Sequence, residues 1–434
     1  MIRRANLRLL LVLRDTWSLL LGIALLMLGH GLQGTLLGVR AGLEHFQPAV
    51  TGVVMSGYYV GLLLGSFHVP RLVARVGHVR VFAALLSLGS TASLFHALMV
   101  EPATWFLMRL MTGYCFAGAF IVAESWLNGA ASTANRGTLL SLYMVDQFGA
   151  LAAGQFLLNV ADPRGFDLFA IASVLISVAA VPLLLASSPA PQIRTPRAVR
   201  LRELYLLSPL GVVGVIGIGF SHSALYAMGP VFAQSSGLSL ALTSTFMAVL
   251  IAGGVLLQWP VGLLSDRFDR RVVIVAVTLL AALAAMSSLP IARPPAWWLF
   301  VQFFIIGGMS LPMYALCAAH ANDFLSREQM LGASSALLLS YGIGAALGPT
   351  AAAFTMQALG PAGLSLFLLV IHASIGGFAL WRMTRRPVVP VEERVPHVLV
   401  PTPSSVMTTL AQSLKEAGRA DARQTAQPAV PEAA

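Results

Sequence analysis

Residues 247–271 read MAVLIAGGVLLQWPVGLLSDRFDRR, an apolar run that ends in a cluster of charged side chains. The run is close to the roughly 20 residues with which a helix crosses the hydrocarbon core of a bilayer. Asp, Glu, Lys and Arg make up only 10% of the 434-residue chain, yet five of the last six residues here are charged. The stretch therefore predicts a membrane-spanning helix followed by a charged loop at the membrane surface.

The composition of the whole chain favours lipid as its solvent. Hydrophobic residues make up 57% of the sequence, and the mean hydropathy is +0.80. Charged residues make up 10% of the chain, whereas a soluble domain contains about 25%. The two cysteines lie inside apolar runs, so we expect neither a disulfide framework nor a metal site. We also expect no cofactor. No small-residue cleavage pattern follows the first apolar run, and we interpret that run as a retained helix.

We predict an all-α membrane protein with twelve transmembrane helices, because twelve apolar runs approach the length of a bilayer-spanning helix. The predicted spans are residues 16–38, 48–70, 80–99, 103–127, 138–160, 166–186, 208–232, 240–264, 272–292, 296–319, 331–357 and 364–383. Most of the loops between them are too short to hold a further domain.

The arginines are distributed unevenly between the two ends of these spans. Nineteen lie in the N-terminal segment, in every second loop and at the start of the tail, whereas three lie on the opposite side. Cytoplasmic loops of membrane proteins carry the excess of basic residues, so this pattern predicts that both termini are cytoplasmic. The net charge of +10 then reflects topology, and we expect no nucleic-acid partner.

The two halves of the chain repeat each other. Offsets of 192 to 194 residues align His30 with His222, Gly61 with Gly253, and Gly113 with Gly307. Parallel repeats of this kind can enclose a cavity at their interface. We predict an N-terminal six-helix half (1–195), a cytoplasmic linker (196–207), a C-terminal six-helix half (208–384) and a disordered cytoplasmic tail (385–434).

Several motifs resemble those of a known family. GLLSDRFDRR (262–271) is similar to the signature loop of the major facilitator superfamily, which lies between the second and third helices of a half. RLMTG (109–113) resembles the second motif of that family, and GAALGP (344–349) resembles its Gly-Pro pattern. AESWLN (123–128) and RVGHVRVF (75–82) resemble an uncharacterised bacterial branch of the superfamily, often called YcaD-like.

The resemblance covers nearly the whole chain except the tail. The first half departs from the pattern at Ala74, where an acid is expected, and the second half has Asp269 where a glycine is usual. The resemblance implies a multi-pass protein of the plasma (inner) membrane of a bacterium, which transports by alternating access. The partners it implies are a small-molecule substrate, protons and membrane lipid, and we expect a monomer.

We interpret the charged cluster as part of a cytoplasmic gate network, although a plain topology signal would also place arginines here. Two acids among the arginines favour a paired network. The predicted members are Asp266, Arg267, Arg270, Arg271, Arg75, Glu124 and Asp323. The resemblance implies that such a network holds the two halves together in one state of the transport cycle.

Two acids, Glu124 and Asp146, lie well inside predicted spans, where an unpaired charge is costly. Glu124 lies about one turn from the cytoplasmic end of its span, and we expect it to pair with Arg71, Arg75 or Arg80. Asp146 lies roughly 12 Å into the fifth span among apolar neighbours. It is either a structural hydrogen-bonding group or a protonatable site on an ion pathway.

Arg109 is the cation inside the fourth span. Either its side chain reaches the outer interface or, as the resemblance implies, it lies in the cavity. His30 and His222 lie on the first and seventh spans, which line the cavity in the superfamily. Either histidine alone is more often a packed, hydrogen-bonded side chain, and their repeat relation adds a shared functional role as the alternative. The predicted substrate and coupling residues are Asp146, Arg109, His30, His222, Gln33 and Tyr226.

The sequence contains no catalytic motif in a workable context, so we predict that the protein is not an enzyme. The function that we favour is secondary active transport of a small organic solute, coupled to protons. One alternative is a multidrug or toxic-compound efflux pump, because walls rich in Met and Phe tolerate varied ligands. The other is a non-transporting membrane sensor that signals through residues 385–434, although nothing in that tail resembles a signalling domain.

Overall fold

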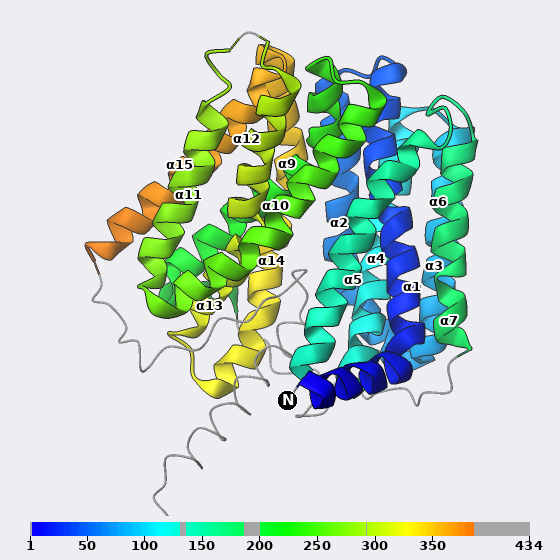
Figure 1. Ribbon diagram of the computed structural model, residues 1–434, viewed down its shortest axis with the longest axis horizontal. Coiled ribbons are helices and arrows are strands. Elements are labelled where there is room, and N and C mark those ends of the chain that lie inside the picture. The colour runs from blue at the N-terminus through cyan, green and yellow to red at the C-terminus, as the bar shows by residue number, and fades with distance from the viewer. Residues whose placement is uncertain (1, 131–135, 186–199, 292, 386–434) are drawn as a thin grey trace, which may run out of the picture.

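A computed structural model describes residues 2–130, 136–185, 200–291 and 293–385 (Figure 1). Every regular element in these residues is helical. The helices are α1 (Ile2–Leu43), α2 (Pro48–Val76), α3 (His78–Leu98), α4 (Pro102–Ala130), α5 (Arg136–Phe156), α6 (Asp167–Val178), α7 (Ala180–Leu184), α8 (Leu201–Leu207), α9 (Pro209–Ser235), α10 (Leu240–Arg267), α11 (Arg270–Met286), α12 (Ala296–Ser310), α13 (Met313–Asn322), α14 (Arg327–Leu359) and α15 (Ala362–Met383), with a 3₁₀ turn (Leu157–Asn159) after α5.

Within the described residues, ten helical segments are long and apolar enough to cross a membrane. Two of them consist of paired helices, α6 with α7 and α12 with α13. The 21-residue α5 and the 17-residue α11 pack among these ten and complete the set of twelve. The prediction of an all-α membrane protein is confirmed, because apolar length alone identifies a spanning helix.

The spanning helices form two groups, α1–α7 and α9–α15, that stand side by side (Figure 1). The aligned glycines make the same contact in each group. A Cβ atom on Gly61 or Gly113 would lie within 2 Å of a backbone oxygen across the α2–α4 contact, and one on Gly253 or Gly307 would lie 2.1 Å from a backbone oxygen across the α10–α12 contact. Both helix pairs therefore depend on glycine for close backbone approach.

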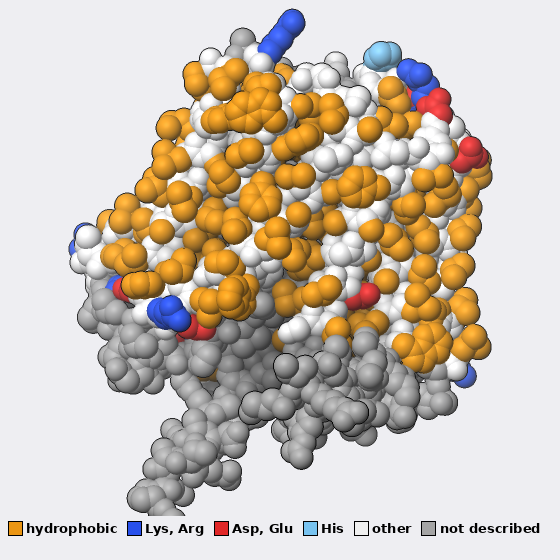
Figure 2. Space-filling view, in the orientation of Figure 1, with side chains coloured by type: hydrophobic (Ala, Val, Ile, Leu, Met, Phe, Trp, Pro, Cys, Tyr) orange, Lys and Arg blue, Asp and Glu red, His pale blue; other side chains and the backbone are white. Residues whose placement is uncertain are grey.

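The outer surface of the bundle is apolar. Large side chains such as Trp17, Leu107 and Trp259 are more than half exposed, and hydrophobic side chains cover the middle of the face in Figure 2, with Lys and Arg near its two ends. Exposing so much apolar surface to water is unfavourable, so this surface requires lipid around it. Helices can lie in hydrocarbon because they satisfy their own backbone hydrogen bonds. The protein is therefore a multi-pass integral membrane protein.

The two groups are joined at the end of the bundle that the arginine pattern predicts to be external. The hydrogen bonds that the structure describes between them all lie there. They run from Ala49 N to Gln357 Oε1 (3.2 Å), from Ser56 Oγ to Thr350 Oγ1 (2.8 Å) and from Asn159 Nδ2 to Ser244 Oγ (3.1 Å). We call this set of contacts the outer seam. The described conformation is therefore closed at that end.

Most helix ends lie within a few residues of the predicted spans, but α1 begins at Ile2, well before the predicted span at residue 16. α14 begins at Arg327 rather than at 331, because Ser326 and Gln329 form a capping box there. Part of the predicted linker is helical, since α8 occupies residues 201–207 and packs against α9 and α14. Residues 196–199 of the linker and 386–434 of the predicted tail lie outside the described residues.

Candidate functional site

A cavity lies between the two groups of helices. Its walls come from α1, α2, α4 and α5 on one side and from α9, α10, α13 and α14 on the other, and α3, α6, α11 and α15 supply none of its described lining residues. The space amounts to about 1450 Å³, including the part that is open to solvent. Because helices of both groups supply its walls, the cavity lies at the interface of the two repeats.

The first-half wall of the cavity carries a cation among aromatic rings. The Arg109 guanidinium lies over the ring of Tyr58, with its central carbon 4.5 Å from the ring centroid. The ring of His30 stacks on Tyr58 at 5.2 Å and lies against Phe116 at 4.9 Å. The side chain of Arg109 is turned into the protein, since the residue is only 3% exposed. Its position in the cavity is the one that the family resemblance implied.

The second-half wall carries a histidine of defined tautomer. His222 Nε2 lies 2.9 Å from the carbonyl oxygen of Ser310 and must donate, because a carbonyl only accepts. Its Nδ1 is then the acceptor, 3.5 Å from the hydroxyl of Tyr341. Behind it, His372 Nδ1 donates to Leu368 O, so the Ser310 hydroxyl donates to His372 Nε2 at 2.6 Å. This chain of hydrogen bonds ties α9 to α12 and α15.

A second polar chain leads from the cavity to Glu124. Gln147 lines the cavity, and its Nε2 donates to the hydroxyl of Tyr143 at 3.2 Å. The Tyr143 hydroxyl donates in turn to Glu124 Oε1 at 3.2 Å. All three residues are at most 1% exposed. The chain therefore crosses from α5 to α4 through a part of the first half that is shielded from solvent.

The expected pairing of Glu124 with the first-half arginines is wrong. The side chains of Arg71, Arg75 and Arg80 are exposed, whereas Glu124 is fully buried. No ion pair joins it to any of these three residues, all of which the structure describes. To reach the buried Glu124, an arginine would have to leave water, and this desolvation is unfavourable. Tyr143 on the neighbouring helix instead donates a hydrogen bond to Glu124 without exposing or burying a second charge.

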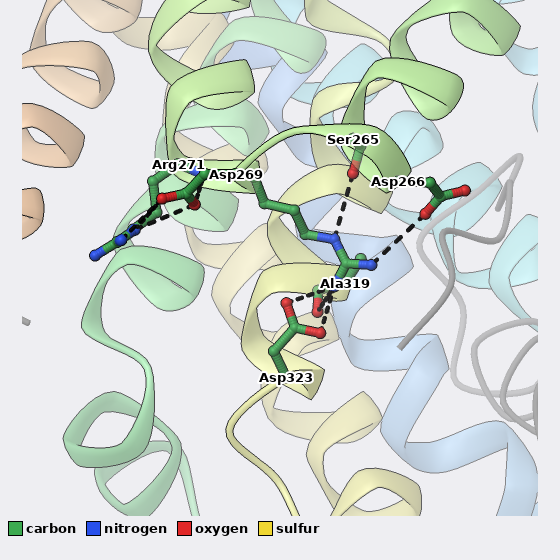
Figure 3. A network of polar contacts seen from close by, with 7 residues as sticks. Ser265, Asp266, Asp269, Arg271, Ala319 and Asp323 are labelled. Atoms are coloured by element: carbon green, nitrogen blue, oxygen red, sulfur yellow. Dashed lines mark hydrogen bonds and ion pairs between the residues drawn. The ribbon is translucent and has the colours of Figure 1, made fainter. Parts of the chain in front are cut away.

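The charged loop after α10 is organised around Arg270, which is 2% exposed (Figure 3). Its guanidinium donates to the carboxylate of Asp323 and, at 3.0 Å, to the carbonyl oxygen of Ala319. Its Nε lies 3.3 Å from Ser265 Oγ, and another of its nitrogens lies 3.8 Å from Asp266. Arg270 therefore ties the end of α10 and the start of α11 to the end of α13.

The other residues of the loop have different positions. Asp269 caps α11 by accepting a hydrogen bond from the Arg271 backbone N–H at 3.0 Å, and its carboxylate pairs with the Arg271 side chain at 2.8 Å. Arg267 is exposed, and Asp266 is 41% exposed. In the first half, Gly77 occupies the position equivalent to Asp269 and has a positive φ of 93°, a conformation that glycine adopts without strain.

Comparisons with known proteins agree with this geometry. The family model described as Major Facilitator Superfamily matches residues 19–308 and 248–419. The chain belongs to the major facilitator superfamily. It is 29% identical over 349 residues to an Escherichia fergusonii protein named "Uncharacterized MFS-type transporter YcaD", and 30% identical over 351 residues to the Escherichia coli protein of that name. Each alignment covers 79% of this chain and 89% of the relative.

Solved structures of superfamily transporters share the fold. The nucleoside transporter NupG superposes with a TM-score of 0.71 at 12% identity, over 85% of this chain and 98% of NupG. A bacterial homologue of the human lysosomal transporter Spinster, in an inward-facing and unoccupied conformation, superposes with a TM-score of 0.65 at 15% identity, over 97% of this chain and 99% of that chain. At these identities the likeness establishes the architecture alone.

Four of the six predicted substrate and coupling residues of this superfamily member line the cavity. They are Arg109, His30, His222 and Tyr226. The other two are placed elsewhere. Gln33 is fully buried, and both polar atoms of its side chain lack a partner among the described residues. Asp146 is half-buried, and one of its carboxylate oxygens is buried without a described partner.

The helical rotation of α5 explains the position of Asp146. Successive residues of an α-helix point about 100° apart. Gln147 and Phe148 line the cavity, whereas Val145 is 67% exposed. Asp146 therefore lies on the flank between the cavity and the outer surface of α5. Its assignment as a coupling residue stays a prediction.

Most of the aromatic lining was not predicted from the sequence. Tyr58, Tyr59, Tyr314 and Tyr341 all contribute to the cavity. A tyrosine inside a spanning segment carries a polar hydroxyl that needs a partner or water, and the adjacent pair at 58–59 was a signal of this kind. The rotation of each helix decides which of these rings faces inward, and the spacing of residues alone does not show it.

Proposed function

We propose that the protein is a secondary active transporter that moves a small organic solute across the bacterial inner membrane by alternating access, with both termini in the cytoplasm. The observation that carries this proposal is the cavity between two repeated groups of helices, with the outer seam closed on one side of it. A site at the interface of two repeats becomes accessible from either side when one repeat rocks against the other.

The outer seam provides a direct test. Ser56 Oγ and Thr350 Oγ1 are 2.8 Å apart across the seam, so cysteines at both positions should form a disulfide in the described conformation. The native Cys115 and Cys317 are both buried and leave a low background. In proteoliposomes screened with a library of labelled solutes, oxidation of the Ser56→Cys/Thr350→Cys protein should stop uptake, and reduction should restore it. Each single-cysteine variant is the control.

Unchanged uptake after complete crosslinking would show that the outer seam does not open during transport, and the proposal of alternating access across this seam would be wrong. If the reduced protein took up none of the solutes, the proposed transport function would have no support.

Coupling to protons is a further part of the proposal, and Asp146 is its candidate carrier. An ionisable residue inside a membrane segment is by default a candidate for a proton path. Asp146 is half-buried, and its helical neighbour Gln147 lines the cavity and begins the chain to Glu124. Protonation at this point can bias the same two-state equilibrium as the bound solute.

Efflux of varied toxic compounds is the second candidate. Three methionines (Met27, Met55 and Met247) and two phenylalanines (Phe120 and Phe148) line the cavity beside the tyrosines. Flexible thioethers and flat rings adapt to ligands of different shape. A solute screen that finds several chemically unrelated ligands for the same cavity would favour this function over transport of one solute.

A further inference from the structure

We propose that the solute is an organic anion whose acidic group binds Arg109 and whose flat or apolar body lies against the tyrosines of the cavity. This inference rests on the proposed transport function and gives its substrate class.

The state of the Arg109 side chain is the first argument. A guanidinium has five N–H donors, yet Arg109 makes no hydrogen bond or ion pair with any described residue, and its Nε and Nη1 are buried. The described contact of the charged group is the face of Tyr58. A buried charge without a partner is costly, so an anion in the cavity would form contacts that the protein itself leaves unmade.

The charge of the cavity is the second argument. Among the described residues that line it, Arg109 is the permanently charged one, and none is an acid. The two acids inside the spans lie elsewhere, Glu124 against Tyr143 and Asp146 on the flank of α5. The cavity is therefore electropositive, which favours an anion and disfavours an organic cation.

The repeat supplies a third, independent argument. The offset that aligns Gly113 with Gly307 places Phe303 at the position of Arg109. Phe303 is fully buried and packs against Phe232 at 4.9 Å and Phe246 at 4.6 Å. The same place in the repeated fold is thus filled by an apolar side chain in the second half. Helix packing does not require a cation there, which indicates that Arg109 serves a ligand.

The rest of the lining describes the body of the ligand. Five rings with hydroxyl groups face the cavity: Tyr58, Tyr59, Tyr226, Tyr314 and Tyr341. Tyrosine offers an apolar face and a polar tip, so these rings fit a flat, partly polar molecule. With one arginine and no second permanent cation in the described lining, a single acidic group matches the cavity better than two.

The test uses matched pairs of probes on the full-length protein in detergent. Benzoate, phenylacetate, hexanoate and benzenesulfonate represent the anions, their amides represent neutral molecules of equal shape, and tetraphenylphosphonium represents the cations. Binding is measured by calorimetry and by the ligand-induced shift of the unfolding temperature. At least one anion should bind, and its amide should bind roughly 10- to 100-fold more weakly, because a charge-assisted pair is lost.

Variants then locate the site. Arg109→Gln should reduce the affinity for the anion by a similar roughly 10- to 100-fold while leaving that for the amide unchanged. Arg109→Lys should retain part of the affinity for the anion, because lysine keeps the charge but not the planar guanidinium. The matched control is Arg202→Gln, which removes an exposed arginine outside the cavity and should leave both affinities unchanged. The wild-type comparison of each anion with its amide decides the charge preference even if an Arg109 variant fails to fold.

Equal affinity for an anion and its amide, undiminished anion binding by Arg109→Gln, or binding by none of the anions would overturn the inference. Transport of a neutral or cationic solute with no effect of Arg109→Gln would also overturn it while leaving the proposed function intact. The crosslinking experiment across the outer seam tests transport independently of the charge of the solute, so the two failures are distinguishable.

Discussion

Replacing Asp323 by Asn tests how the loop after α10 is held. Arg270 and the Asp323 side chain are 2% and 3% exposed, so the pair lies out of water. Removing one member of a buried ion pair leaves an uncompensated charge and costs about 3–5 kcal/mol. Asp266, 3.8 Å from Arg270, is 41% exposed, and an exposed pair contributes about 0–1 kcal/mol. We therefore expect Asp323→Asn to be destabilising by about 3 kcal/mol and Asp266→Asn by less than about 1 kcal/mol.

The assay is the unfolding temperature of each purified variant in one detergent. It is determined from the fraction of monodisperse protein that remains after heating. Temperatures rather than free energies are compared, because a large membrane protein does not unfold in two states. The double variant Arg270→Met/Asp323→Leu should recover much of the loss, since an apolar pair of similar volume can replace a buried ion pair. An equal loss in Asp266→Asn and Asp323→Asn would refute the assignment of Asp323 as the principal partner, and so would a double variant no more stable than Asp323→Asn.

Three further predictions concern topology, the chain to Glu124 and coupling. A reporter fused after Val160 should behave as external and one fused after Arg385 as cytoplasmic; the same side for both would contradict the twelve-span topology. Tyr143→Phe should be destabilising by about 1–3 kcal/mol, because the buried Glu124 loses a hydrogen bond. The control is Tyr205→Phe, at a residue that is 45% exposed. Equal unfolding temperatures for the two variants would argue against the hydrogen-bonded chain to Glu124. Asp146→Asn should abolish accumulation driven by a pH gradient but retain solute exchange without one in proteoliposomes, whereas continued accumulation would exclude Asp146 and make the histidine pair His30 and His222 the next candidates.

The sequence by itself determined the solvent of the protein, the number of spans and the repeat. These properties follow from the length of apolar runs and from residue spacing, which are read along the chain without knowledge of contacts. The glycine pairs that the repeat aligns, such as Gly61 with Gly253, make equivalent contacts with a neighbouring helix in the structure. Glycine at a fixed spacing permits close backbone approach in either half.

Only the tertiary structure decided which polar side chains meet. Gln147 lines the cavity and Asp146 does not, although they are adjacent in the sequence, because one residue turns an α-helix by about 100°. Glu124 accepts a hydrogen bond from Tyr143 on the next helix, and it does not pair with Arg71, Arg75 or Arg80 of the first half. Arg109 lies in the cavity over Tyr58 instead of reaching the outer interface. The rotation of each helix is set by packing against its neighbours, and that packing sums many weak contacts between residues far apart in the chain.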